Sequence, residues 1–199
     1  MTGEWIVWSY TAAFYETGDI VSFASALLSL LPIFIVIFLA GLASASRYPR
    51  QDAALVLLLA LCQNTVLNAI LKKVLKMPRP HHYLRRSGEI GAPSSHGMPS
   101  DHAQFMFFFV TWLLRKAHAN KIPVPVGMQL FLLGAATLVA CGRVYNSFHT
   151  VAQVVVGAIV GIVNAYTLSS TFGESLLLHT ARIVSPVRDL CTAWVPYVG

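Results

Sequence analysis

The sequence predicts an all-α protein, a polytopic membrane bundle of about five transmembrane helices. Hydrophobic residues make up 56% of the 199 residues and charged residues only 11%, against about 25% charged in an ordinary soluble domain. The mean hydropathy is +0.64. The apolar residues also fall into runs of roughly 20, the length that a helix needs to cross the hydrocarbon core of a membrane. At this chain length we expect a single domain, residues 1–199.

Polar residues and prolines divide the apolar runs. The first run contains Pro32, which can kink a helix. The purely apolar part of the third run is short, so this span needs Arg115 and Lys116 to extend their side chains to the membrane surface. Pro123 and Pro125 then interrupt the chain before the fourth run. The expected spans are about residues 20–43, 53–75, 100–118, 126–145 and 149–172.

Both ends of the chain are expected to lie at the membrane surface. Residues 4–15 are rich in tryptophan and tyrosine, which concentrate at membrane–water interfaces. Residues 174–199 contain apolar patches separated by His179, Arg182 and Pro186. This tail fits either an interfacial helix or a short sixth membrane segment.

Two sets of residues mark helix faces that should point into the bundle. Asn64, Asn68 and Lys72 recur every four residues, so they share one face of the second span. In lipid, such a polar face must point to the protein interior, where we expect the asparagines to bond to other helices. Gly157 and Gly161 form a GxxxG pair that lets another helix approach the fifth span closely.

The long polar interval, residues 72–102, carries many of the cations of the chain. It holds six of the 14 basic residues, whereas the whole chain has only eight acidic ones. Charges placed among membrane helices need partners, so we expect an anionic ligand here. No basic face interleaved with exposed aromatic residues is present, which argues against nucleic acid as the partner.

Residue types and topology together describe a phosphate site. The cations of Lys72, Arg79 and Arg143 can bind phosphoryl oxygens. Ser100 suits the N-cap of the third helix, whose N-terminus offers free N–H groups to an anion. Two spans separate this interval from Arg143 and His149, so both basic clusters should face the same side of the membrane.

Two histidines are candidates for the chemistry at this site. His149 and Gln153 are four residues apart, so the amide can bond one imidazole nitrogen and leave the other to attack phosphorus. His102 is the candidate acid for the leaving group. His81, His82 and His96 lack a set of carboxylates, so we expect no metal and no other cofactor.

These residues resemble the phosphatidic-acid phosphatase type 2 superfamily, whose motifs are KxxxxxxRP, PSxH and SRxxxxxHxxxD. The matching residues are Lys72…Arg79-Pro80, Pro99-Ser100-Asp101-His102 and Gly142-Arg143…His149…Gln153. The stretches YETGDIVSFASALLSLLPIFIV, GMPSDHAQFMFFF and GRVYNSFHTVAQVVVG look like the dolichyl diphosphatase branch in particular. The resemblance covers roughly residues 15–165.

The resemblance implies a phosphohistidine mechanism. His149 would be the nucleophile and His102 would protonate the leaving group, while Lys72, Arg79, Ser100 and Arg143 would hold the phosphoryl oxygens. The chain departs from the superfamily pattern twice: Gly142 replaces a serine and so removes a hydroxyl, and Gln153 replaces an aspartate, as the dolichyl branch looks to do. The role of Asp101, inside PSxH, is not explained.

Several of these residues and motifs have alternative explanations. Pro93–His96 also fits PSxH, but only Pro99–His102 opens directly onto a helix, so we prefer the second copy. The cysteines, Cys62, Cys141 and Cys191, lie in or beside apolar sequence without disulfide or zinc spacing, and we interpret them as buried. The interval also carries basic residues that we assign to lipid headgroups, namely Lys73, Lys76, Arg85 and Arg86.

The expected function is hydrolysis of a polyprenyl diphosphate, with dolichyl diphosphate as the leading candidate. The rivals are a phosphatase for phosphatidate or a sphingoid phosphate, and a non-catalytic binding protein or scramblase for a lipid carrier. Basic residues outside the site favour a multi-pass protein of the endoplasmic reticulum membrane with its site facing the lumen. The sequence does not indicate an oligomeric state.

Overall fold

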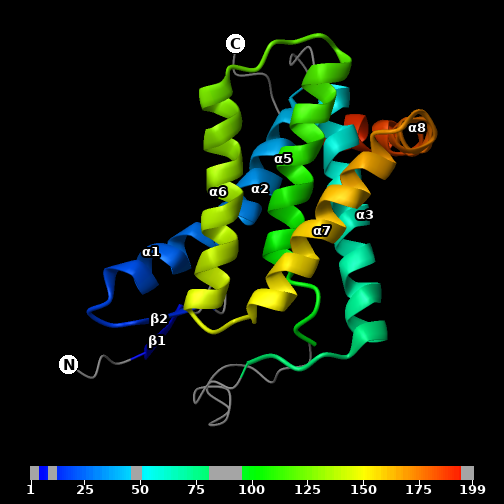
Figure 1. Ribbon diagram of the computed structural model, residues 1–199. Helices are drawn as coiled ribbons and strands as arrows, with labels where there is room; N and C mark the ends of the chain where they lie inside the picture. Colours follow the sequence, from blue (N-terminus) through cyan, green and yellow to red (C-terminus); the bar gives the residue numbers. More distant parts are fainter. Residues whose placement is uncertain (1–4, 9–12, 46–50, 81–95, 194–199) are drawn as a thin grey trace.

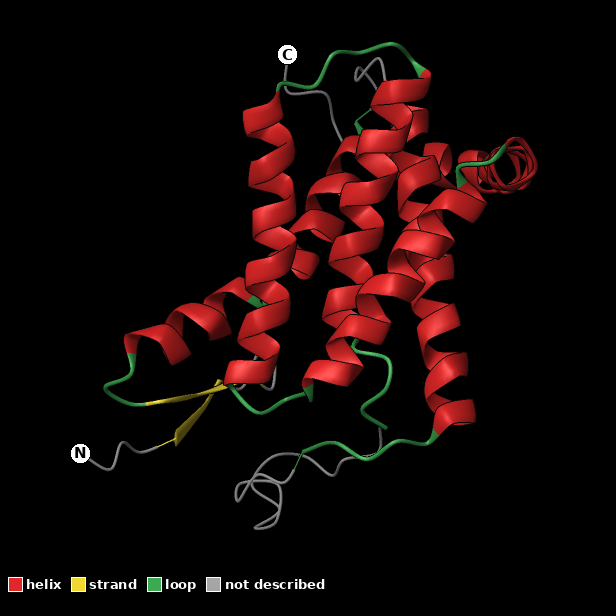
Figure 2. Ribbon diagram, in the orientation of Figure 1, coloured by secondary structure: helices red, strands yellow, loops and turns green. Residues whose placement is uncertain are grey.

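The computed structural model describes residues 5–8, 13–45, 51–80 and 96–193 (Figure 1). Most of them are helical, which confirms the predicted all-α bundle (Figure 2). The elements, in chain order, are the strands β1 (Trp5–Trp8) and β2 (Ala13–Glu16) and the helices α1 (Ile20–Leu28), α2 (Leu31–Ser44), α3 (Gln51–Leu75), α5 (Asp101–Ala119), α6 (Val126–Tyr145), α7 (Val151–Leu168) and α8 (Thr171–Ala193).

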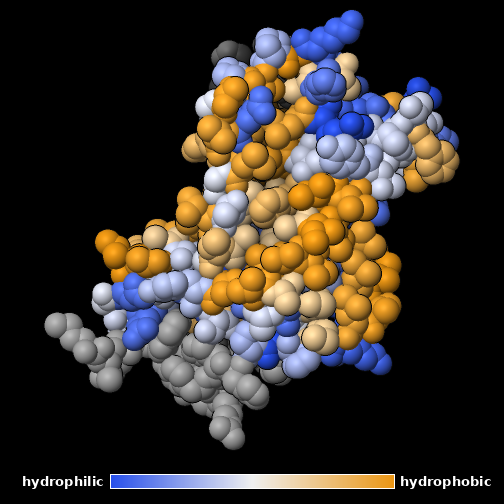
Figure 3. Space-filling view, in the orientation of Figure 1, coloured by the Kyte–Doolittle hydropathy of each residue, from blue (hydrophilic) through white to orange (hydrophobic). Residues whose placement is uncertain are grey.

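Within the described residues, four segments are long and apolar enough to cross a membrane: Ile20–Ser44, Asp52–Leu75, Val126–Tyr145 and Val151–Leu168. The remaining predicted span, α5, is not among them, because charged residues occupy its first and last turns. It nevertheless runs along the bundle between α6 and α7 (Figure 1). Apolar side chains cover the middle of the visible face, and hydrophilic ones gather above and below (Figure 3).

The first membrane segment is broken into α1 and α2. Pro32 has no backbone N–H, so no helical hydrogen bond reaches the carbonyl of Leu28. The N–H of Ile33 then donates to Leu30 at 3.0 Å in place of Ser29, the acceptor of a regular α-helix. α1 therefore leaves the bundle obliquely, while α2 continues along α3 (Figure 1). The predicted kink is confirmed.

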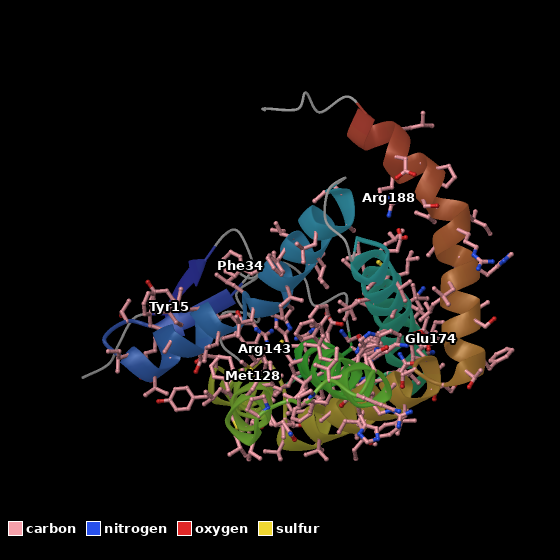
Figure 4. All side chains as sticks on the ribbon, turned by 90° about the horizontal axis from the view of Figure 1, so that it is seen from above. Tyr15, Phe34, Met128, Arg143, Glu174 and Arg188 are labelled. Atoms are coloured by element: carbon pink, nitrogen blue, oxygen red, sulfur yellow. The ribbon has the colours of Figure 1, made fainter. Side chains whose placement is uncertain are left out.

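The fifth predicted span ends earlier than expected, and the tail forms one helix. α7 stops at Leu168, and not at residue 172 as predicted, because the chain turns at Ser169 and Ser170. α8 is seen end-on in Figure 1 and lengthwise in Figure 4, in which α5 and α6 are end-on. It therefore lies across the bundle and is not a sixth span.

The ends of α8 are fixed to other helices by ion pairs. Lys116 of α5 pairs with Glu174. Arg188 pairs with Asp52 of α3 at 2.8 Å. Both partners lie at the end of the bundle where α3 begins and α5 finishes, opposite the end where α7 begins.

A two-stranded antiparallel hairpin precedes α1. It pairs Trp5 with Glu16 and Trp8 with Ala13. The sequence did not predict these strands. Phe14 on β2 is fully buried and stacks on Phe148 at 4.1 Å between ring centroids, so the hairpin contacts the turn between α6 and α7.

The packing of α5 and α7 explains the GxxxG pair. A Cβ atom on Gly157 would lie 2.6 Å from the carbonyl oxygen of Ser100, so a side chain would force the two helices apart. Gly161 makes the same kind of contact with the backbone of Gln104. The predicted close helix approach is confirmed.

The polar face of α3 points inward, as predicted. Asn64 and Asn68 are each 2% exposed. The amide of Gln104 donates to Asn64 at 3.0 Å and accepts from Asn68 at 2.8 Å, while Asn164 of α7 donates to Asn64 at 3.0 Å. The cysteine interpretation, in contrast, is wrong for Cys62 and Cys141, which are both exposed; the side chain of Cys191 lies outside the described residues.

Candidate active site

The three predicted motifs meet at one end of the bundle. This end, at the bottom of Figure 1, holds the end of α3, the start of α5 and the turn between α6 and α7. The N–H of Ser100 donates to the carbonyl of Gln153 at 3.0 Å, and the N–H of His149 donates to the carbonyl of Arg143 at 3.1 Å. Arg79 donates to the carbonyl of Phe148 at 3.4 Å.

His149 is held in one tautomer by two oxygen atoms. Its Nδ1 lies 2.9 Å from the carbonyl oxygen of Gly97 and 3.2 Å from Oε1 of Gln153. Both atoms can only accept, so Nδ1 carries the proton and Nε2 keeps its lone pair. The side chain is 2% exposed. This is the arrangement that a nitrogen nucleophile requires.

The Gln153 amide is itself oriented by two hydrogen bonds besides its contact with His149. Its Nε2 donates to the carbonyl of Pro78 at 2.6 Å, and its Oε1 accepts from the N–H of Thr150 at 3.2 Å. The Thr150 hydroxyl in turn accepts a hydrogen bond from the Gln153 N–H, which completes a capping box at the start of α7. The amide therefore links the first motif, through Pro78, to the third.

Gly97 is a part of the site that the sequence interpretation missed. Its N–H donates to the carbonyl of Met77 at 2.7 Å, which brings its own carbonyl to His149. A Cβ atom at this position would lie 2.5 Å from Nε2 of Gln153 and 2.7 Å from Oε1, so a larger residue would displace the Gln153 amide. The position of this glycine, just before the PSxH motif, was the feature of the sequence that could have indicated its role.

The cations differ in burial in the way that a ligand site requires. Lys72 and Arg79 are half-buried and Arg143 is buried, whereas Lys73 and Lys76 are exposed. The side chain of Arg143 points into the bundle (Figure 4). Its guanidinium lies 3.7 Å from the centroid of the Phe148 ring, so it is held by a cation–π contact as well as by its backbone.

Burial and positive charge keep His149 neutral. Burial is the largest cause and the charges of Arg79, Arg143 and Lys72 the next, and together they lower the pKa of His149 from 6.5 to about 3. Burial also lowers the pKa of Arg79, while the carboxylate of Asp101 opposes that change. Asp101 thus places a negative charge near Arg79, one of the candidate phosphate-binding cations.

Ser100 has the properties of a ligand contact. It is the N-cap of α5, but its side chain makes no capping hydrogen bond. The residue is fully buried, and its hydroxyl has no partner among the residues that the structure describes. A buried hydroxyl without a partner costs free energy. A phosphoryl oxygen at the N-terminus of α5 would supply that partner.

His102 is fixed by a backbone carbonyl from outside the three motifs. Its Nε2 lies 3.1 Å from the carbonyl oxygen of Ser29. That carbonyl is available because the break before Pro32 removes its helical donor. The acceptor assigns the Nε2 proton to His102 and leaves Nδ1 for proton exchange. Pro32, in the first predicted span, was the feature of the sequence that could have indicated this contact.

The comparisons with known proteins agree with this geometry. The family model of the PAP2 superfamily matches residues 53–176. The chain belongs to this superfamily. It is a lipid phosphatase of the multi-pass membrane type.

Several curated relatives carry a more specific name. Dolichyldiphosphatase 1 of Homo sapiens is 28% identical over 98% of this chain and 79% of its own length. Dolichyldiphosphatase of Saccharomyces cerevisiae is 31% identical over 76% of this chain and 64% of its own length. Lipid phosphate phosphatase gamma of Arabidopsis thaliana is 32% identical over 74% of this chain and 65% of its own length. No solved structure gives a significant match.

The departure from the superfamily pattern at Gly142 has a packing explanation. A Cβ atom there would lie 2.9 Å from Cβ and 3.2 Å from Oγ of Ser25 on α1. Helix α1, which lies outside the matched segment, therefore occupies the space that a side chain at position 142 would fill. Asn146, in the same turn as His149, also holds α1: its amide accepts from the Ser22 hydroxyl at 2.9 Å.

Some predicted residues fall outside the described part of the chain. These include most of the rival motif copy, residues 93–95, and four cations or histidines, His81, His82, Arg85 and Arg86. His96 is described and half-buried, and it directly precedes Gly97. Among the described residues, no group of three or more His, Cys, Asp or Glu side chains could hold a metal ion.

Proposed function

We propose that the chain hydrolyses a polyprenyl diphosphate, dolichyl diphosphate in the first instance, to the monophosphate and inorganic phosphate. The observation that carries the proposal is His149, a buried neutral imidazole with Nδ1 bonded to two acceptors and three cations acting on it. The names of the animal and yeast relatives support the diphosphate substrate.

The first step transfers phosphorus to the protein. Nε2 of His149 attacks the terminal phosphorus, and the bond from that phosphorus to the bridging oxygen breaks. The electron pair stays on the bridging oxygen. His102, which must carry a second proton on Nδ1 when the anionic diphosphate is bound, donates that proton to this oxygen as polyprenyl phosphate leaves and so becomes neutral. Lys72, Arg79, Arg143 and Ser100 hold the oxygens of the transferred group.

The second step regenerates the nucleophile. A water oxygen attacks the phosphorus of the phosphohistidine, and the phosphorus–nitrogen bond breaks with its electron pair returning to Nε2. Neutral His102 accepts a proton from that water, which restores its starting state. Inorganic phosphate is then released. Every proton and electron pair is accounted for by His149, His102, substrate and water.

Charge stabilisation contributes more than proton donation in this scheme. The leaving group is a phosphate monoester, which is much less basic than an alkoxide. Fixed cations that meet developing charge in a site sheltered from water are the strongest source of transition-state stabilisation. Because side-chain cations fill this role, we expect the reaction to proceed in the presence of chelators.

The decisive experiment measures phosphate release by the purified protein in detergent. Dolichyl diphosphate, dolichyl phosphate and phosphatidate are compared side by side, each with and without vanadate and EDTA. We expect vanadate-sensitive, EDTA-resistant release from the diphosphate, loss of activity in His149→Ala, and an acid-labile phosphoprotein in the wild type.

Each alternative has its own result in this assay. Preference for phosphatidate would favour a wider lipid phosphate specificity, in keeping with the name of the Arabidopsis relative. Binding without release or vanadate inhibition would favour a lipid-carrier binding protein. Normal turnover by His149→Ala would end the mechanism.

The proposal includes a lumenal site in the endoplasmic reticulum membrane. The basic residues away from the site are Arg47, Arg50, Arg115, Lys116, Lys121, Arg182 and Arg188, and the positive-inside rule assigns that side to the cytosol. We compare Lys76→Cys, at the site end, with Lys121→Cys, at the other; both positions are exposed.

The labelling experiment uses a background in which the three native cysteines are replaced by serine. In sealed right-side-out microsomes, an impermeant maleimide should label only Lys121→Cys. Lys76→Cys should react after the membrane is permeabilised. The reverse pattern would place the site in the cytosol without affecting the proposed reaction.

A further inference from the structure

An apolar groove runs along the outside of the bundle between α6 and α7. Its volume is about 430 Å³. It is lined by residues of three helices, among them Ala140 and Cys141 of α6, Val155 and Ala158 of α7, and Phe107 of α5. Among the described residues that line it, none carries a charge.

The groove begins at the candidate active site. Tyr145 and Val151, which line its near end, are the last residue of α6 and the first of α7. They flank the turn that carries His149. The helical positions that line α6, from Thr137 to Tyr145, extend the groove about 12 Å into the membrane at 1.5 Å per residue.

The groove and the start of α5 also share packing. Ala103 follows His102 directly, and it packs with Ala140 and Val154 under the groove. The same Ala103 lies 3.3 Å from the Cβ position of Gly157. The lining of the groove is thus continuous with the helix N-terminus at which Ser100 and His102 lie.

The positions of glycine and alanine in the sequence explain why the helices leave this space open. α7 uses its glycine face to pack against α5, as Gly157 and Gly161 show. Its adjacent side carries Val151 and Val155, which are 63% and 48% exposed. The small side chains of Ala140 and Ala158 then leave a hollow where larger residues would have joined α6 to α7.

We infer that this groove binds the first isoprenyl units of the polyprenyl chain of the substrate. The inference rests on the proposed function and adds the location of the lipid. A chain attached to phosphate at His149 must leave the polar site towards hydrocarbon, and apolar sites between bundle helices are suited to such ligands. A second cavity, about 650 Å³, is lined in part by Arg115 and His118 and lies at the opposite end.

The first test fills the groove. Ala158→Phe places a ring in it, whereas Ile159→Phe is a matched control, since Ile159 is 55% exposed and does not line the groove. We expect Ala158→Phe to lower kcat/KM for a long-chain polyprenyl diphosphate about tenfold or more, as a misfit in an apolar pocket does. The inhibition constant of vanadate, which occupies only the phosphate site, should stay unchanged in both variants.

The second test uses two native cysteines. Cys141 lines the groove and Cys62 lies on α3, and both are exposed. In a His149→Ala, Cys191→Ser background, which keeps substrate intact, polyprenyl diphosphate should slow alkylation of Cys141 by a membrane-permeant maleimide several-fold. Alkylation of Cys62 should not change, and inorganic phosphate should protect neither cysteine.

The outcomes separate this inference from the proposed function. If Ala158→Phe and Ile159→Phe hydrolyse the long-chain diphosphate equally well, or if Cys62 and Cys141 are protected equally, the chain does not lie in this groove, although the protein is still a diphosphatase. If the wild type releases no phosphate from any polyprenyl diphosphate, the proposed function fails first. A change in vanadate inhibition in Ala158→Phe alone would show a distorted phosphate site and overturn the groove argument.

Discussion

The carbonyl oxygen of Gly97 lies 2.9 Å from Nδ1 of His149. This contact joins the loop before α5 to the candidate nucleophile, which is 52 residues further along the chain. Together with Gln153, it decides which imidazole nitrogen carries the proton. A backbone atom outside the three motifs therefore helps to fix the tautomer of the candidate nucleophile.

Gly97→Ala should disable the site without unfolding the bundle. Its Cβ atom would lie 2.5 Å from the Gln153 amide, so the amide must move and release His149. Displacement of a reacting group by about 1 Å can cost about 10²-fold in rate, and we expect a loss of kcat/KM of that order. Gly134→Ala is the control, since nothing lies within 4 Å of its Cβ position. Equal activity of the two variants would contradict the role of Gly97.

The positions of the motifs could be predicted from the sequence for simple reasons. Helical periodicity placed Asn64, Asn68 and Lys72 on one inward face, and the number of spans brought Lys72 and Arg143 to the same end. Both arguments depend only on the regular geometry of helices. They do not depend on how the helices pack.

Other features could not be predicted, because they do not depend on which side chains the sequence contains. The carbonyls of Gly97 and Ser29 belong to the backbone, and every residue has one. The approach of α1 to α6 depends on the absence of a side chain at Gly142, which the sequence alone showed only as a missing hydroxyl. α8 lies across the bundle through contacts between residues far apart in the sequence: Leu177 and Ala181 pack in the core, and Arg188 pairs with Asp52, 136 positions away.

The two copies of PSxH can be separated by single substitutions. His102→Ala removes the residue that opens α5 beside Ser29, and the rate should fall by about 10² to 10⁴, as for other lost general acids. The lower end of that range is expected because the leaving group is only weakly basic. His96→Ala should retain most of the rate. Steady-state assays of the two purified variants decide between them, and a crippled His96→Ala would reverse the motif assignment.

Helix α1 should be required for activity although it lies outside the matched family segment. Gly142→Ala brings a Cβ atom to 2.9 Å from Cβ of Ser25, and such overpacking costs about 1–3 kcal/mol. As α1 shifts, the Ser29 carbonyl should leave His102, and kcat/KM should fall together with thermal stability.

The companion substitution Ser25→Gly removes the clash. Although glycine within a helix costs up to about 1 kcal/mol, the double variant Ser25→Gly, Gly142→Ala should be more active than Gly142→Ala alone. Activity and melting temperature measured for the four proteins of this cycle give the coupling between the two positions. Simple additivity of the two effects would mean that α1 and α6 do not depend on each other at this contact.

The pH dependence should report the contact between Gln153 and His149. The attacking nitrogen must be unprotonated, so kcat/KM falls as the pH drops through the pKa of His149, which is about 3 in the wild type. A carboxylate at position 153 would stabilise the imidazolium and raise that pKa. Gln153→Asp should therefore remain partly active, with the acid limb of its kcat/KM profile moved to higher pH. Gln153→Leu cannot accept the Nδ1 proton or donate to Pro78, so its rate should fall about 10²-fold at every pH. Its acid limb should not move to higher pH, because the lost hydrogen bond raises the pKa of His149 in the wild type. An acid limb that stays in place in the Asp variant would mean that residue 153 does not act on the nucleophile.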